Sequence, residues 1–245
     1  MRKLRESDES DARHQAPSIV FHFLGCVPYQ RCAELLQQLV REARSSTKPR
    51  CVVLLAEHPP EITVGRRGSR RHVRLSAADF ATRNLQVRWA PRGGGCVLHA
   101  RGQLAVYPII PLALLGWTLA DFRKKFHCGL ARALQSCGYE PSPTLPGAGI
   151  WGKSGVLAAT GIGETGGVTH HGAWLNVNPD AQDFSAIDIV PPESVAPSVK
   201  TTMSSLLAEH RRPVRMTTVR ASMVENLATA LGCEAPHIAT GHPWL

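Results

Sequence analysis

The stretch Arg92-Gly93-Gly94-Gly95-Cys96-Val97-Leu98-His99 lies between two segments, 84–89 and 104–110, whose β-branched and apolar residues predict strands. Three consecutive glycines let a backbone come close to another group and expose its N–H donors, which suits a carboxylate, a phosphate or an acyl carbonyl. A flexible surface turn is the alternative for the glycines alone. The arginine before them and the histidine after them favour a binding loop.

A second stretch, His170-His171-Gly172-Ala173-Trp174-Leu175-Asn176-Val177-Asn178, falls within a strand predicted for residues 168–177. Adjacent residues of a regular strand point to opposite faces of a sheet, so the two histidines are not expected to bind one metal ion. We expect His171 to face a pocket, because Gly172 follows it, and His170 to face solvent or a helix. The alternative is a hydrogen-bonded histidine of the core.

The remaining patterns predict one α/β domain over residues 18–245. Apolar and β-branched runs predict further strands at 18–24 and 51–56 and a hairpin at 150–162. The helix that starts at Thr118 has capping-box spacing to Asp121, and a glycine at position 138 ends it. Apolar stripes predict helices at 29–43, 118–137, 199–209 and 217–231.

The composition excludes several classes of protein. No apolar run approaches the ~20 residues of a membrane span, so we expect no membrane partner. Residues 1–17 are polar and lack the apolar stretch of a secretory signal, which predicts a disordered tail on a cytoplasmic protein. Seven widely spaced cysteines without a C-x-x-C pair favour a reducing compartment and indicate neither a disulfide framework nor a zinc site.

Positive charge is densest at residues 66–74, RRGSRRHVR, in a chain of net charge +9. A solvated loop and a docking patch for an acidic protein are both consistent with this run. Arginines also bind the phosphates of nucleic acid. The chain lacks the zinc-finger spacing, the RNP motif and the interleaved aromatic residues of nucleic-acid-binding domains, so we expect no nucleic-acid partner.

Residues 147–154, GAGIWGKS, satisfy the phosphate-loop pattern G-x-x-x-x-G-K-[ST], which binds nucleotides only between a buried strand and a helix N-terminus. Prolines at positions 141, 143 and 146 precede the pattern, and the segment 156–162 after it is a poor helix. This context opposes a nucleotide hydrolase. The sequence also lacks G-x-S-x-G, which lowers the expectation of a Ser-His-Asp esterase.

Several segments, in order, resemble the protein octanoyltransferases (the lipoate-protein ligase B type), which are relatives of the lipoate- and biotin-protein ligases. The segments are LGCVPY at 24–29, EHPPEITVGR at 57–66, the glycine loop up to residue 104, the hairpin at 146–161 and THHGAWLNVN at 169–178. The resemblance covers residues 18–210. It implies an α/β (α+β) fold in which a mixed β-sheet is flanked by helices.

The family that this chain resembles moves octanoate from acyl carrier protein to a lysine of lipoyl domains, without a metal ion or a nucleotide cofactor. A cysteine thiolate accepts the acyl group as a thioester, and a lysine beside it favours the thiolate. Alignment places Val190 at the cysteine position and Val156 at the lysine position. The resemblance assigns substrate binding to Arg92, Gly93, Gly94, Gly95, Cys96, Val97, Leu98, His99, Ala159, Thr160, Gly161, His171, Gly172, Ala173 and Trp174.

Three functional hypotheses follow from the resemblance and its departures. The first is a working octanoyltransferase that uses another group, such as Cys96 or Lys153, with octanoyl-acyl carrier protein and lipoyl-domain proteins as partners. The second is an inactive relative that binds an acyl chain, an acyl carrier or a lipoyl domain. The third is an ATP-dependent enzyme similar to the lipoate ligases, which the missing lysine at position 156 opposes.

Overall fold

A seven-stranded mixed sheet forms the centre of the computed structural model, which describes residues 17–141, 149–183, 185–188 and 203–245. The first three strands in its spatial order are parallel and the others are antiparallel. The α/β fold predicted from the sequence is confirmed. The order is β10 (His237–Thr240), β1 (Ser18–Cys26), β2 (Arg50–Glu57), β6 (Gln103–Ile109), β9 (Val168–Asn176), β8 (Val156–Thr165) and β7 (Gly149–Trp151).

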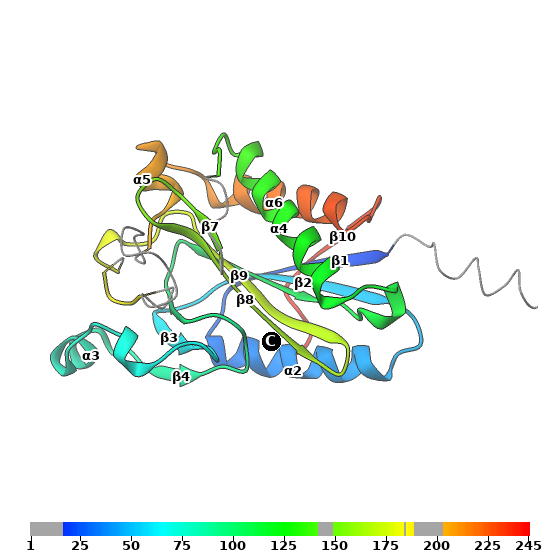
Figure 1. Ribbon diagram of the computed structural model, residues 1–245, viewed down its shortest axis with the longest axis horizontal. Helices are drawn as coiled ribbons and strands as arrows, with labels where there is room; N and C mark the ends of the chain where they lie inside the picture. Colours follow the sequence, from blue (N-terminus) through cyan, green and yellow to red (C-terminus); the bar gives the residue numbers. More distant parts are fainter. Residues whose placement is uncertain (1–16, 142–148, 184, 189–202) are drawn as a thin grey trace, which may run out of the picture.

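Two layers cover the sheet (Figure 1). On one side lie helices α4 (Leu119–Ser136) and α6 (Met216–Ala230), which pack against each other. On the other side lie helix α2 (Tyr29–Ser45) and a small sheet in the order β4 (Val87–Trp89), β3 (Glu61–Val64) and β5 (Cys96–His99). The short helices are η1 (Arg70–His72), α3 (Ala77–Arg83), η2 (Ala113–Leu115), η3 (Ala181–Asp183) and α5 (Leu206–His210).

Local signals explain why α4 begins and ends where predicted. The Thr118 hydroxyl accepts the Asp121 N–H at 3.1 Å, and the Asp121 carboxylate accepts the Thr118 N–H at 3.0 Å, so both partners of a capping box are present. Gly138, just after the helix, has φ +78°, a left-handed conformation that glycine adopts without strain. Phe122 and Phe126 stack on each other and are fully buried on the face toward the sheet.

Two predicted elements differ from the structure. The helix predicted for 199–209 is confirmed from Leu206 onward and is wrong for residues 203–205, because α5 starts only at Leu206. Ser205 is the N-cap of that helix, and its hydroxyl accepts the Ala208 N–H. Serine favours the N-cap position over a helix interior. The strand predicted for 84–89 starts only at Val87, since Asn84 caps α3 with φ 47°.

No helix in the described part of the chain is long and apolar enough to cross a membrane. The tail predicted for residues 1–17 lies, except for Pro17, outside the described residues. Position 190 also lies outside them.

Candidate functional site

The glycine loop lies across the edge of β8, just beyond the end of β7. Gly93 donates its N–H to the Ile162 carbonyl at 3.1 Å. A Cβ atom on Gly161 would lie only 2.6 Å from the Gly93 carbonyl oxygen, so both glycines are needed for this approach. The structure thus brings together two groups of residues that the sequence predicted for substrate binding.

Arg92 holds this loop from the inside. Its side chain is completely buried, and its guanidinium donates to the carbonyls of Gly93 and Gly95 and to the carbonyl and hydroxyl of Thr63, at 2.8–3.0 Å. Burial lowers the pKa of Arg92 to about 10, so the group stays charged at neutral pH. Arg92 therefore shapes the loop and presents no guanidinium surface to solvent.

The indole of Trp174 occupies the space beneath the loop. Its side chain is 1% exposed, the Arg92 guanidinium carbon lies 4.6 Å from the ring, and His99 meets it edge to face at 5.8 Å between centroids. Its N–H donates to the Tyr107 hydroxyl at 3.1 Å. The neighbouring predicted residues are buried as well, namely Cys96, Val97, Leu98, His99, Ala159, Gly161, Gly172 and Ala173. Trp174 thus fills space between the loop and the sheet.

A cluster of histidines and tyrosines continues from Trp174 toward α2. His58 must donate from Nδ1 to the Val27 carbonyl at 2.7 Å, which leaves its Nε2 to accept the Tyr107 hydroxyl at 2.8 Å. His99 Nε2 forms a hydrogen bond with the Thr63 hydroxyl at 2.9 Å, and the His99 ring stacks on Tyr29. No site role was predicted for Tyr29, His58 or Tyr107, because only long-range packing brings them together.

Burial determines the charge of this cluster. It lowers the pKa of His58 to about 4, and it lowers the pKa values of His99 and His171 well below the usual range. It raises the pKa of Tyr29 to about 12. Near pH 7 the three imidazoles are therefore neutral hydrogen-bonding groups.

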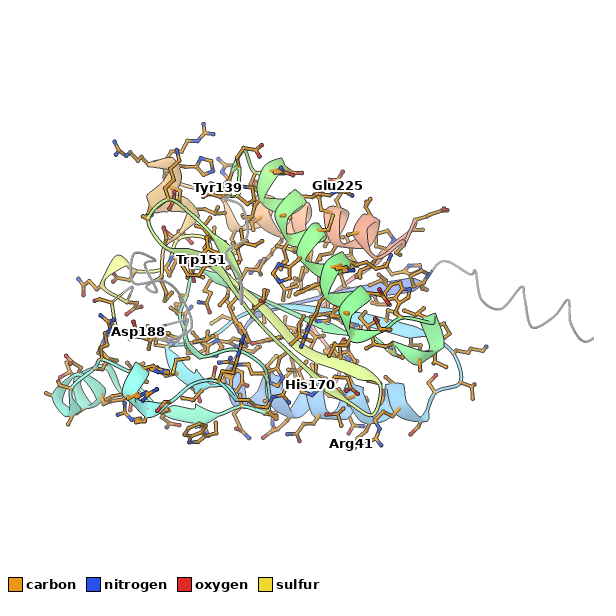
Figure 2. All side chains as sticks on the ribbon, in the orientation of Figure 1. Arg41, Tyr139, Trp151, His170, Asp188 and Glu225 are labelled. Atoms are coloured by element: carbon orange, nitrogen blue, oxygen red, sulfur yellow. The ribbon has the colours of Figure 1, made fainter. Side chains whose placement is uncertain are left out.

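The two adjacent histidines do not point to opposite faces, so this expectation is wrong, whereas His170 does lie toward a helix, α2, which is one of the two surroundings expected for it. His171 has φ 54°, which breaks the alternation of a regular strand, and the two Nδ1 atoms lie 2.7 Å apart. His171 Nε2 bonds the Tyr29 hydroxyl at 3.0 Å, and His170 Nε2 bonds Thr165 at 3.1 Å. Figure 2 shows His170 on the side of the β8–β9 hairpin toward α2.

Both histidines line a cavity of about 430 Å³ between α2 and the β8–β9 hairpin. Apolar side chains from α2 and the exposed Trp89 form part of its wall, and Arg41, Arg44 and Arg88 also line it. A second cavity of about 350 Å³ is lined by Gly93, Gly94, Thr160 and Gly161 of the predicted set.

The position predicted for a catalytic lysine carries no reactive group. Val156 is completely buried at the start of β8, where it pairs with Trp151 and Met203. Lys153 lies in the β7–β8 turn and is exposed. Cys96 is buried, its thiol donates to the Ser69 carbonyl at 3.5 Å, and burial raises its pKa, so the thiol is not activated as a thiolate.

The described residues of the phosphate-loop pattern, 149–154, do not form a phosphate loop, because a strand and a hairpin turn occupy these positions. Lys153 and Ser154 lie in a hairpin turn, and their N–H groups donate to the Glu209 carboxylate at 3.1 and 3.0 Å. A carboxylate thus satisfies the donors that a phosphate would need. Among the described residues, no group of three or more His, Cys, Asp or Glu side chains is arranged to hold a metal ion.

Comparisons with known proteins show which family this chain resembles in sequence. The model of the lipoyl protein ligase A/B catalytic domain matches residues 28–228. An octanoyltransferase of Roseiflexus sp. (strain RS-1) is 32% identical over 232 residues, 93% of each chain. An octanoyltransferase of Syntrophotalea carbinolica is 34% identical over 208 residues, 85% of this chain and 92% of that protein.

Solved structures show the same fold at low sequence identity. A putative lipoate protein ligase from T. acidophilum with bound lipoic acid has a TM-score of 0.67 and 12% identity, covering 94% of this chain and 91% of that chain. A lipoate-protein ligase A bound with ATP has a TM-score of 0.66 and 15% identity over the same shares of the two chains.

Proposed function

The chain belongs to the family of lipoyl protein ligase A/B catalytic domains, and from this membership we propose that it serves protein lipoylation by binding octanoyl-acyl carrier protein without transferring the acyl group through a cysteine thioester. The observation that carries the proposal is Val156, a fully buried valine that packs beside Trp151 and Met203. An alkyl side chain can neither attack a thioester nor lower the pKa of a neighbouring thiol. Valine at position 190 has the same lack of reactivity.

Three buried cysteines support this proposal. Burial raises the pKa values of Cys32 and Cys51 to about 12, and it also raises the pKa of Cys96. A thiol with a raised pKa holds its proton at neutral pH and is a poor nucleophile.

Two measurements on the same preparation test the proposal. Octanoyl-acyl carrier protein is titrated into the protein by calorimetry, and the intact mass of a lipoyl domain is followed in the same mixture without ATP. We expect binding but no gain of an octanoyl group, while an active octanoyltransferase assayed in parallel modifies the lipoyl domain. A gain of one octanoyl group above the enzyme-free control would contradict the proposal.

A working octanoyltransferase is the second candidate, and one observation favours it. Tyr29, His171, His170 and Thr165 form a continuous chain of hydrogen bonds beside the larger cavity. If the Tyr29 hydroxyl moved away from it, Nε2 of a neutral His171 could accept the proton of a lysine amine as the amine nitrogen bonds to the thioester carbonyl carbon. The C–S bond would then break, and the proton would pass to the leaving thiolate.

If transfer is seen, His171→Ala tests whether His171 takes part in it. Loss of octanoyl transfer in this variant, with carrier binding retained, would assign the proton transfer to His171. Unchanged transfer would exclude it. The mass measurement is repeated with lipoate and ATP, because product formed only under those conditions would instead indicate a ligase.

A further inference from the structure

A basic groove lies where the glycine loop meets β8. It has a volume of about 350 Å³, and its lining comes from four separate parts of the chain. Arg66 and Arg67 follow β3, Arg123 and His127 come from α4, and Thr160, Gly161 and Ile162 belong to β8. Gly93 and Gly94 of the glycine loop complete the lining.

All charged side chains that line this groove are basic. No aspartate or glutamate is among its lining residues, and within the described part of the chain neither Arg66 nor Arg123 has an ion-pair partner. Both arginines are exposed, whereas His127 is partly buried and lies 3.5 Å from the Thr160 hydroxyl. Guanidinium groups bind the oxygens of a phosphate with charge-assisted, often bidentate hydrogen bonds.

The glycine loop contributes only backbone to the groove. Gly94 has φ +79°, and a Cβ atom on it would lie 3.0 Å from the Thr160 carbonyl oxygen, so a side chain at this position would be strained and crowded. Gly93 is equally close to the Ile162 carbonyl oxygen. The loop therefore keeps side chains away from the space between the two arginine-bearing walls.

We propose that this groove binds a phosphate group, and that its source is the phosphodiester of the pantetheine arm that carries the acyl thioester. The second half rests on the proposed function, which supplies an acyl carrier protein as partner. Thr160 lies four residues along β8 from Val156, a separation of ~13 Å in an extended strand. The groove therefore lies near the position where the resemblance places the lysine, although Thr160 faces α4 and Val156 belongs to the core cluster on the α2 side of the sheet.

Three small ligands test the phosphate site without any acyl transfer. Inorganic phosphate, 4′-phosphopantetheine and pantetheine are titrated into the full-length protein by calorimetry at constant ionic strength. We expect both phosphate-bearing ligands to bind and pantetheine to show no binding. Tighter binding of 4′-phosphopantetheine than of inorganic phosphate would assign the arm as the source, and equal binding would assign free phosphate.

Arg123→Gln and Arg66→Gln should each weaken phosphate binding about tenfold, since each removes one charge-assisted contact. Lys124→Gln is the matched control, because Lys124 is the exposed neighbour of Arg123 on α4 and does not line the groove. Thermal melting of each variant establishes that it folds. Absence of phosphate binding, or equal binding by Arg123→Gln and Lys124→Gln, would overturn the proposal.

The failure of this inference differs from the failure of the proposed function. If the whole carrier binds but 4′-phosphopantetheine does not, the carrier is held elsewhere and the phosphate site is wrong. If phosphate binds but the carrier does not, the groove stands as a site for free phosphate and the proposed function is wrong.

Discussion

The N–H of Trp174 donates to the hydroxyl of Tyr107 at 3.1 Å, and that hydroxyl in turn donates to His58 at 2.8 Å. The hydrogen bond between Trp174 and Tyr107 joins the predicted motif on β9 to β6, and both side chains are almost completely buried. Trp174 is therefore both an apolar filler and a specific donor.

Trp174→Ala should lower the free energy of unfolding by about 3–5 kcal/mol, because it leaves a cavity and removes the donor to Tyr107. Trp174→Phe should cost less, since most of the apolar contact remains. Denaturant unfolding measures both changes. Trp89→Ala is the control, because Trp89 is 70% exposed and its removal should change the stability by less than about 0.5 kcal/mol. Equal effects at positions 89 and 174 would contradict a packed interior beneath the glycine loop.

Arg92→Lys should destabilise the protein by about 3 kcal/mol and should not behave as a conservative change. An ammonium group lacks the fork of donors that reaches Thr63, Gly93 and Gly95. Hydrogen exchange of the loop amides should become faster in this variant. The exposed Arg101 provides the comparison, and Arg101→Lys should leave the same amides unchanged. If the loop amides exchange as slowly in Arg92→Lys as in the unmodified protein, the loop conformation does not depend on the guanidinium.

Stability should fall as the pH is lowered from 7.5 to 5. The pKa of His58 is about 4 in the folded protein and near the ordinary 6.5 after unfolding, so the unfolded chain binds the extra proton. The contribution of neutral His58 to the free energy of unfolding is fully present above about pH 6.5 and is lost progressively down to about pH 4. His58 alone should contribute a loss of about 2 kcal/mol at pH 5, and the lowered pKa values of His99 and His171 act in the same direction.

Denaturant unfolding at the two pH values measures this loss. His58→Gln, which keeps a donor and an acceptor but does not titrate, should show a smaller loss. The same pH dependence in both proteins would mean that His58 is not the group responsible.

A thiol reagent should label the native protein first at Cys26 and Cys128, which are exposed. Cys32, Cys51, Cys96 and Cys233 are buried and should react only after unfolding, because both access and the raised pKa values of the first three protect them. Peptide mass spectrometry after short labelling identifies the sites. Rapid labelling of Cys96 would instead favour the hypothesis that it replaces the usual nucleophile.

Glu209→Ala should loosen the β7–β8 turn. Its carboxylate accepts the N–H groups of Lys153 and Ser154 and the hydroxyl groups of Ser154 and Ser204. Hydrogen exchange at Lys153 and Ser154 should become faster, with little change elsewhere. Glu225→Ala on α6 carries the same loss of one negative charge and serves as the control. Unchanged exchange at the turn would show that the backbone alone holds it.

Elements with strong local signals were predictable from the sequence. The helix after Thr118 has its cap and its apolar stripe in adjacent residues, and the hairpin at 150–162 has a glycine-rich turn between two apolar segments. The start of the helix predicted for 199–209 was wrong in its described part, because Ser205 caps the helix and Met203, two residues earlier, forms a β-bridge with Val156. The expectation that His170 and His171 point to opposite faces failed because the sequence does not reveal the positive φ of His171.

The sequence by itself determined the reactive groups that this protein has, because nucleophilicity and charge belong to residue types. Valines at 156 and 190 carry no thiol and no amine in any conformation. Only the tertiary structure decided that Trp174 fills the space beneath the glycine loop and that Arg66 and Arg123 share one groove. These features depend on how distant segments pack, and packing is set by shape and burial rather than by neighbours in the chain.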